Sequence, residues 1–311
     1  MTSTNIAKVP PQSDNEVVAV VCYLCHDGGT DEADQPLRRD CACRGTDAGF
    51  VHLSCLAEFA SFQSKQATSG MIKFIKPWRV CPSCHQFYQN NLAIDIVTEF
   101  VLFVQGQYPD DTKRQVESLY SKLRAIMGML KRLQPVQKRE AEDTANLLLS
   151  FIDRMKTEVS PLTRRYSHFE ADVYNALGGI VLDEGTDESA RRAVAHFENA
   201  LEVNEAIGNA EGIATAKRNI AYAKSKYEGG NNNEELLKAS QDVYKMRVAR
   251  LGEEHENTIN AGKIYALRLR QANREEEARD LLMKLFATSK QVLGPYHNTT
   301  KDIESKLQLI L

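Results

Sequence analysis

Cysteine is missing from most of this chain. All seven cysteines lie between Cys22 and Cys84, and the 227 residues that follow have none. Long uncharged apolar runs are missing too, because the most apolar stretch, Leu92 to Val104, contains two carboxylates. We therefore expect no membrane-spanning helix. The apolar run over residues 17–21 is too short for a signal peptide and follows acidic residues, so we expect a soluble cytoplasmic protein, with the nucleus left open.

A charge excess is also missing. The chain has 39 basic and 42 acidic side chains, a formal charge of −3 and a pI near 6.2. Nucleic-acid binding needs a basic excess, so we expect no nucleic-acid partner. Apolar residues make up 42% of the chain, which is enough for packed cores, and 311 residues suggest about two domains.

The cysteines that are present stand in short pairs, and the unpaired one follows a histidine at the same spacing. The pairs are Cys22 and Cys25, Cys41 and Cys43, His52 and Cys55, and Cys81 and Cys84. Seven thiols and one imidazole fill two tetrahedral zinc sites with no ligand left over. A disulfide framework is the alternative, but seven is an odd number and no secretory signal is present. We therefore predict two Zn²⁺ ions as cofactors.

Two further histidines stand beside these ligands. His26 and His85 directly follow Cys25 and Cys84, where the direction of the chain turns a side chain away from the metal. We expect both to lie near the sites without binding the ions.

The order and spacing of the eight ligands resemble those of a RING-CH (RING-variant) zinc domain. Eight residues separate Cys43 from His52, and 25 residues separate Cys55 from Cys81. The local sequence resembles the same family at Cys-Tyr-Leu-Cys-His-Asp, Cys-Ala-Cys-Arg-Gly-Thr, Phe-Val-His-Leu-Ser-Cys-Leu and Cys-Pro-Ser-Cys. The resemblance covers residues 17–91.

A PHD finger, which reads histone tails, is the nearest alternative because it has the same ligand order. Such fingers usually have a longer second pair, a shorter run to the histidine, and tryptophan two residues before the seventh ligand. Trp78 lies three residues before Cys81, so RING-CH is favoured. A PHD-like peptide reader would build its cage from acidic and aromatic residues, namely Asp27, Asp31, Glu32, Asp34 and Trp78.

The resemblance implies how the ligands share the two ions. In RING-type domains the first ligand pair joins the third, and the second joins the fourth. One site would then contain Cys22, Cys25, His52 and Cys55, and the other Cys41, Cys43, Cys81 and Cys84. Metal would replace the core that so short a module cannot build, so that zinc binding drives its folding.

The same resemblance implies a ubiquitin-protein ligase. Such a domain binds a ubiquitin-conjugating enzyme charged with ubiquitin and orients its thioester, without a covalent intermediate of its own. The matching positions form a conjugating-enzyme surface of Leu24, Phe59, Pro82 and His85. Phe59 stands where the family usually has tryptophan, and the alternative interpretation places it in a helix core over residues 53–62. His85 stands where many active RING domains have arginine or lysine.

Beyond residue 92 the pattern changes to long helices separated by breaks. The predicted helices cover residues 92–104, 112–133 and 137–159, and the breaks are residues 107–111, Pro135 and Pro161. These helices form either an extended spacer or a packed bundle, and the sequence does not separate the two.

A repeat starts near Tyr166. The motif Leu-Gly-Glu-Glu-His at residues 251–255 recurs as Leu-Gly-Pro-Tyr-His at residues 293–297, 42 residues later. The intervening helical hairpins resemble tetratricopeptide (TPR) units, and their length resembles the longer repeats of kinesin light chain. We expect three hairpins closed by a terminal helix over residues 299–311. Hairpin turns are predicted at Gly185, Gly229, Gly230 and Asn273.

An array of this kind offers a concave groove for a peptide or a partner helix. Arg218 and Asn219 fall where TPR grooves present polar contacts, although a solvent-exposed helix face is the alternative. We predict that the array recruits a protein or peptide substrate. If the RING-CH domain has lost its conjugating enzyme, the alternative is a non-catalytic scaffold for protein interactions.

The predicted architecture has four parts. A disordered tail over residues 1–16 precedes the RING-CH domain (17–91), a helical connector (92–160) and TPR-like repeats (161–311). The predicted fold class is a small zinc-stabilised α+β RING-like domain followed by an all-α helical-hairpin solenoid.

Overall fold

The computed structural model describes most of the chain. The described residues are 20–41, 43, 48–67, 70–129, 133–158, 164–227 and 233–309. The predicted tail over residues 1–16, the predicted break at Pro161 and the predicted turn at Gly229 and Gly230 lie outside the described residues.

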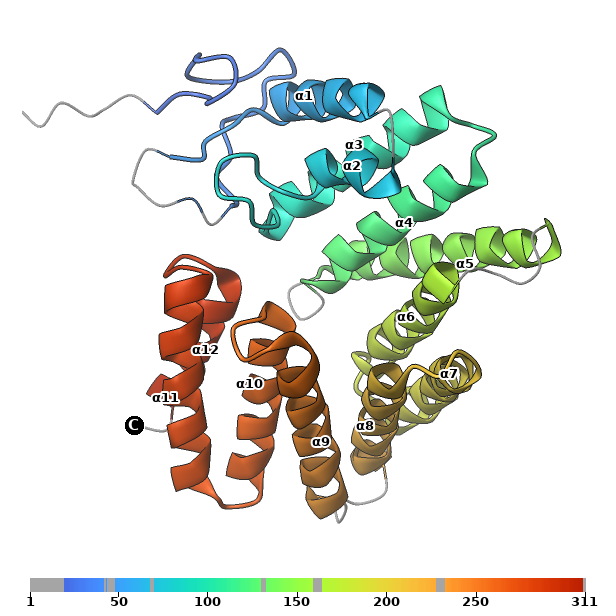
Figure 1. Cartoon of the computed structure of the whole chain (residues 1–311), viewed down its shortest axis with the longest axis vertical. Helices are drawn as coiled ribbons and strands as arrows, with labels where there is room; N and C mark the ends of the chain where they lie inside the picture. The colour runs from blue at the N-terminus through green and yellow to red at the C-terminus, as the bar shows by residue number, and fades with distance from the viewer. Residues whose placement is uncertain are drawn as a thin grey trace, which may run out of the picture.

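Helices make up the regular structure of the described residues (Figure 1). The N-terminal region contains α1 (Leu53–Gln66), α2 (Met71–Ile75) and the short 3-10 helix η1 (Lys76–Trp78). Next come α3 (Asn90–Gln107), α4 (Thr112–Met127), α5 (Pro135–Glu158) and α6 (Arg164–Leu182). The chain continues with α7 (Asp187–Ala206), α8 (Ala210–Tyr227), α9 (Asn233–Leu251), α10 (Glu256–Gln271), α11 (Glu275–Val292) and α12 (Asn298–Gln308).

Strand pairing supplies the β component of the N-terminal region. It consists, over the described part of the chain, of three isolated antiparallel bridges, which join Thr30 to Pro36, Arg38 to Val51 and Val80 to Phe87. The bridges hold together the loops that surround the cysteine pairs.

The N-terminal region has an apolar core of its own that includes α3. Trp78 is fully buried, its ring stacks on Phe100 with centroids 5.1 Å apart, and its Nε1 donates to Ser64 Oγ at 2.8 Å. On the opposite side of α3, Ile94 and Val101 pack into a second core, which is formed mainly by α4, α5 and α6. The helix is therefore shared by the two cores, which joins them into one packed unit.

The ends of the predicted helices differ from those in the structure. The first predicted helix, 92–104, is α3, which begins at Asn90 and extends to Gln107, into the predicted break over residues 107–111. The second predicted helix ends at Met127 instead of residue 133, because Gly128 follows it and glycine is a poor helix former. The next helix begins at Pro135 instead of after it. Proline fits the first helical position, since the N–H group that it lacks would have no intrahelical partner there.

The helices α3 to α6 pack against one another in chain order, so the connector is a packed bundle and not a spacer. A partly buried ion pair joins α4 to α6. Arg165 donates through Nε (2.5 Å) and Nη2 (2.8 Å) to the two carboxylate oxygens of Glu117, whose side chain is 1% exposed. These hydrogen bonds raise the pKa of Arg165.

Three helical hairpins follow, α6–α7, α8–α9 and α10–α11, and α12 covers the last one, as predicted. Gly185 (φ +78°) and Asn273 (φ +58°) occupy the turns of the first and third hairpins in the left-handed region, which these residue types tolerate. Close approach of α6 and α7 also needs a glycine. A Cβ atom at Gly178 would overlap the ring of Phe197.

Two connectors between helices have the same backbone turn and helix cap, which explains the repeated Leu-Gly-x-x-His motif. We call residues 251–255, between α9 and α10, the middle connector, and residues 293–297, between α11 and α12, the last connector. Gly252 (φ +83°) and Gly294 (φ +96°) turn the chain. The following histidines, His255 and His297, are N-cap residues, and their Nδ1 atoms accept from the backbone N–H two residues on at 3.1 and 3.2 Å.

The array curves so that its last hairpin returns to the N-terminal region (Figure 1). Gln86 Nε2 donates to the carbonyl oxygen of Leu293 at 3.1 Å, over a separation of 207 residues. Among the described helices, none combines the length and the apolar composition needed to cross a membrane.

Candidate metal centres

The first candidate centre gathers four side chains from two segments, Cys22, Cys25, His52 and Cys55. The two cysteines of the first pair lie on a turn, and His52 is the N-cap residue of α1. His52 Nδ1 lies 3.5 Å from Cys25 Sγ and 3.8 Å from Cys55 Sγ. Tetrahedral zinc bonds of about 2.3 Å to sulfur and 2.0 Å to nitrogen would place such atoms about 3.5 Å apart. The donors therefore fit zinc.

The other ring nitrogen of His52 orients the imidazole. His52 Nε2 lies 3.4 Å from the carbonyl oxygen of Gly29, and the side chain is buried. A proton on Nε2 that is donated to this carbonyl leaves the lone pair of Nδ1 for the metal. The backbone of the first cysteine turn thus selects the tautomer that can bind an ion.

The second candidate centre contains Cys41, Cys43, Cys81 and Cys84, whose sulfur atoms lie within 4.8 Å of one another. Cys43 Sγ and Cys81 Sγ are 3.7 Å apart, close to the sulfur–sulfur distance of about 3.8 Å in a tetrahedral zinc site. The two tetrads thus have the interleaved composition that a RING-type pairing implies.

Without a cation, the cysteines of the second centre do not all deprotonate. Burial raises the pKa of Cys43 to about 12, whereas a hydrogen bond from Cys41 lowers the pKa of Cys81 to about 5. Without a cation, Cys43 would therefore stay a thiol beside the thiolate of Cys81. A divalent cation lets all four deprotonate and bind, so the cluster is suited to a metal ion.

Two residues outside the predicted ligand set shape the second centre. Gly49 has φ +82°, and a Cβ atom there would lie 2.8 Å from Cys41 Sγ and 2.9 Å from Cys43 Cβ. Arg39 Nη2 donates to the carbonyl oxygen of Cys43 at 3.2 Å. The signals in the sequence were a glycine shortly before His52 and a basic residue shortly before the second cysteine pair.

The turns at Cys22 and Cys81 have the same backbone geometry. The N–H of His26 donates to the carbonyl oxygen of Cys22 at 2.9 Å, and the N–H of His85 donates to that of Cys81 at 2.9 Å. Both histidines have φ near +60° (+65° and +59°) and exposed side chains outside the tetrads. They lie beside the two tetrads and belong to neither.

The residues predicted for the conjugating-enzyme surface lie around these turns and on α1. Leu24, Phe59 and Pro82 are half-buried, and His85 is exposed. Leu24 packs against the edge of the N-terminal core, whereas Phe59 is not among the described residues that form this core. The interpretation of Phe59 as a helix-core residue therefore loses support.

The residues predicted for the peptide groove lie on α8, the first helix of the second hairpin. Arg218 Nη2 donates to Asn219 Oδ1 at 2.8 Å, and Asn219 Nδ2 donates to Asn175 Oδ1 on α6 at 2.9 Å. The guanidinium of Arg268, on α10, lies 4.6 Å from the centroid of the Tyr222 ring on α8. These contacts form a polar row across the first helices of all three hairpins.

The polar row is positively charged. Burial and the charges of Arg247 and Arg268 lower the pKa of Arg218 to about 10. Arg247 is compensated by Glu211, with Nε and Oε1 3.0 Å apart, whereas Arg268 Nε is buried without a hydrogen-bond partner among the described residues. An anionic group near Arg218 would therefore be stabilised.

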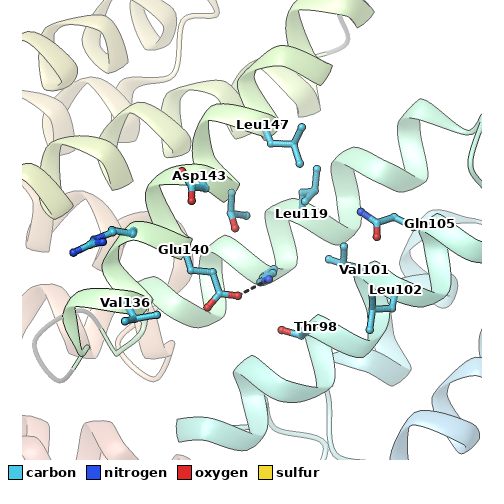
Figure 2. Close-up of a pocket in the computed structure, with 12 residues that line it drawn as sticks. Thr98, Val101, Leu102, Gln105, Leu119, Val136, Glu140, Asp143 and Leu147 are labelled. Carbon is cyan, nitrogen blue, oxygen red and sulfur yellow. Dashed lines mark ion pairs between the residues drawn. The ribbon is translucent and has the colours of Figure 1, made fainter.

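A groove of about 510 Å³ that the sequence did not predict lies on α4, between α3 and α5 (Figure 2). Leu102 and Leu147 line it and are 56% and 43% exposed. An ion pair between Lys122 Nζ and Glu140 Oε1, 2.6 Å long, crosses it. None of the residues predicted for a site belongs to this groove.

Comparison with known proteins supports the assignment of the N-terminal region. Residues 22–84 match the family described as the RING-variant domain. No curated protein matches the chain. Two solved structures from Podosopora anserina, both described as a putative kinesin light chain with nearly identical TPR-like repeats, are similar to this chain. One of them, a variant form, has 14% identity, a TM-score of 0.38, and covers 77% of this chain and 95% of its own. The other has 13% identity, a TM-score of 0.37 and the same coverage.

The family match spans the same residues that supply both tetrads. The chain therefore carries an N-terminal RING-variant domain with two Cys/His tetrads arranged as zinc sites, followed by an all-α array of stacked helical hairpins.

Proposed function

We propose that this protein is a RING-type ubiquitin-protein ligase in which the RING-variant domain binds a charged conjugating enzyme and the helical array recruits the substrate. The observation that carries the proposal is the interleaved pair of tetrads. Metal binding at both centres would hold the two cysteine turns and the start of α1 together, and these segments carry Leu24, Phe59, Pro82 and His85. The reaction would take place in the cytoplasm or nucleus.

The chemistry of the cysteines supports catalysis by orientation. All seven cysteines belong to the tetrads, so none is left to carry ubiquitin as a thioester. The domain would hold the thioester of the conjugating enzyme in place for attack by a substrate lysine amine. An isopeptide bond would form as the thiol of the conjugating enzyme leaves, with no covalent intermediate on this chain.

Apolar contact would dominate the conjugating-enzyme surface. The half-buried side chains of Leu24, Phe59 and Pro82 would lose their remaining exposed area in the complex. His85 would stand beside the bound ubiquitin, where arginine would carry a full positive charge. Because arginine is always charged and offers five donors in a rigid fork, we expect modest activity that rises in His85→Arg.

The polar row of the array supports recruitment of an acidic segment. Within the described part of the chain Arg218 has no carboxylate partner, and the charges that lower its pKa are those of Arg247 and Arg268. A carboxylate or phosphate of a substrate peptide would neutralise it. Asn219 is hydrogen-bonded to both Arg218 and Asn175. It would hold the Arg218 side chain in position for such a peptide.

A reconstituted ubiquitination reaction tests the ligase. The purified chain is incubated with activating enzyme, a broad panel of conjugating enzymes, ubiquitin and ATP, and we expect ubiquitin chains with at least one member. The double variant Leu24→Ala/Pro82→Ala should lose this product while still binding two zinc ions in native mass spectrometry. If no member of the panel makes product above this variant, the proposal is wrong.

The second candidate function is a non-catalytic zinc-stabilised scaffold, which His85 and Phe59 favour because both depart from the residues of active RING domains. Binding of a conjugating enzyme, observed as NMR shifts at Leu24, would contradict it. A PHD-like reader is disfavoured, because Trp78 is 1% exposed and donates to Ser64. It is therefore not free to form a peptide cage.

A further inference from the structure

The last connector lies against the RING-variant domain, although more than 200 residues separate the two in sequence. Three hydrogen bonds join the last connector and Asn298, the first residue of α12, to the domain. Gln86 Nε2 donates to Leu293 O at 3.1 Å, Asn298 N donates to Gln89 Oε1 at 2.8 Å, and Asn298 Nδ2 donates to Asn90 Oδ1 at 2.8 Å. The remaining amide atoms, Gln86 Oε1 and Gln89 Nε2, are buried without a hydrogen-bond partner among the described residues.

The same residues lead directly to the second metal centre. Asn90 Nδ2 donates to Asp40 Oδ1 at 2.8 Å, and Gln89 N donates to Asp40 O at 2.7 Å. Asp40 precedes the ligand Cys41, and Gln86 stands two residues after the ligand Cys84. The last connector thus contacts both segments that supply the second tetrad.

An arginine reinforces the contact. The guanidinium of Arg39 lies 5.6 Å from the ring centroid of Tyr296, in the last connector, and 5.5 Å from that of Phe50. Cation–π contacts at such distances are favourable. Because Arg39 also donates to the carbonyl oxygen of Cys43, it bridges the last connector and the second centre.

The sequence of the last connector differs from that of the middle connector where it meets the domain. Both have the same backbone turn and histidine cap. The positions occupied by three glutamates, Glu253, Glu254 and Glu256, around the middle connector are occupied by Pro295, Tyr296 and Asn298 around the last one. A carboxylate at position 298 would face the side-chain oxygens of Gln89 and Asn90, whereas positions 295 and 296 are exposed. The absence of a carboxylate at position 298 therefore suits docking.

We propose that the last connector is a clasp that holds the RING-variant domain and the helical array in one fixed orientation. Asn298, Gln89 and Gln86 are then positioning residues, which set the distance between the conjugating-enzyme surface and the polar row. The clasp leaves that surface accessible, because Leu24, Phe59 and Pro82 stay partly exposed with the last connector in place. A fixed distance limits which lysines the bound thioester can reach; this second role rests on the proposed ligase function.

The variant Gln86→Ala/Asn298→Asp tests the clasp without weakening α12. Aspartate is favourable in the first turn of a helix, but it cannot donate to Asn90 Oδ1 and places a charge beside Gln89 Oε1. Asn257→Asp is the matched control, because it makes the same change in the first turn of α10, at a position after the middle connector that does not meet the domain. Native mass spectrometry should find two zinc ions in all three proteins.

Hydrogen exchange and small-angle scattering report the clasp directly. In the double variant we expect amide exchange over residues 293–299 and 86–93 to accelerate by about tenfold, since two hydrogen bonds are lost, and the radius of gyration to increase. The control should match the wild type in both. Unchanged exchange and an unchanged radius in the double variant would overturn the clasp.

Self-ubiquitination reports the positioning role. With a conjugating enzyme that supports activity, mass spectrometry would map the modified lysines of each protein, and we expect an altered set only in the double variant. An opened clasp with an unaltered set would overturn the positioning role. A wild-type chain that makes no ubiquitin product would count against the proposed ligase, while exchange and scattering would still decide the clasp.

Discussion

At the scale of single residues, the metal centres depend on neighbours that do not bind metal. Gly29 orients His52 through its carbonyl oxygen, and Gly49 leaves the space that Cys41 and Cys43 occupy. The two effects differ in kind. The first acts on the tautomer of a ligand, and the second acts on the room available to two ligands.

The variant Gly49→Ala should weaken zinc binding at the second centre. Its Cβ atom would lie 2.8 Å from Cys41 Sγ, and its positive φ costs an additional ~1–2 kcal/mol. We expect zinc release to a chelator to be faster by at least about tenfold. Gly70→Ala is the control, because Gly70 has φ +87° with nothing within 4 Å of the new Cβ atom. Equal release from both variants would show that backbone strain alone, and not the contact with sulfur, matters.

His297 should make the stability of the last hairpin depend on pH. Burial lowers the pKa of His297, although Glu256 lies 3.8 Å from its Nε2, and its Nδ1 must stay unprotonated to cap α12. Because the folded pKa lies below the unfolded value of about 6.5, this contribution is complete above pH 6.5 and is lost as the pH falls below it.

The variant His297→Asn measures this contribution, because asparagine caps a helix without titrating. We expect the free energy of unfolding of the wild type to fall more steeply than that of the variant between about pH 7 and about pH 5.5. Other titrating groups, including the metal ligands, are common to both proteins and cancel in the difference. Parallel pH profiles would contradict the role assigned to His297.

At the scale of elements, the junction between the RING-variant domain and the array consists of packed helices. One side of α3 completes the core around Trp78, and the other side packs with α4 and α5. The predicted domain limits at residues 91 and 160 stay predictions. The packing of α3 nevertheless means that a fragment ending at residue 91 would lack Phe100 and its neighbours and expose the ring of Trp78, and we expect it to aggregate.

The ion pair between α4 and α6 should contribute to the stability of this junction. In Arg165→Met the carboxylate of Glu117 would stay buried without its partner, and we expect a loss of about 2 kcal/mol, discounted because Arg165 is 43% exposed. Arg191→Met, at an exposed pair with Glu188 on α7, should change stability by less than about 0.5 kcal/mol. Denaturant unfolding of both variants measures the difference, and equal losses would contradict the assignment.

At the scale of the whole molecule, metal removal should unfold the N-terminal region and also loosen the last connector near the C-terminus. The variants His52→Ala and Cys55→Ala, or chelation of zinc, should unfold the N-terminal region because its small core needs the metal. The hairpins should keep their helical circular dichroism, since their cores contain no metal ligand among the described residues.

The last connector should respond to the same treatment, although it lies far from the ligands in sequence. Without the second centre, Gln86, Gln89 and Asn90 lose their fixed positions, and we expect faster hydrogen exchange over residues 293–299. Exchange over α7 and α8 serves as the internal reference and should not change. Loss of helical signal across the whole array would contradict the two-part architecture.

The sequence by itself determined the metal ligands and the helical repeats. Ligand spacing is a local property of tight turns, so Cys-x-x-Cys, Cys-x-Cys and His-x-x-Cys identify donors without a fold. Apolar periodicity and the repeated Leu-Gly-x-x-His motif likewise depend on residues within one or two helical turns of each other in the sequence. The helix caps formed by His255 and His297 explain why histidine recurs in that motif.

Only the tertiary structure decided how these parts meet. Whether the connector helices form a spacer or a bundle depends on the two-sided packing of α3, which periodicity alone does not reveal. The contact of Asn298 with Gln89 and Asn90 depends on the curvature of the array from α6 to α12, which accumulates small rotations between successive hairpins. Such long-range contacts are hard to detect in the local sequence; here the one sign is asparagine at position 298, where the middle connector is followed by Glu256.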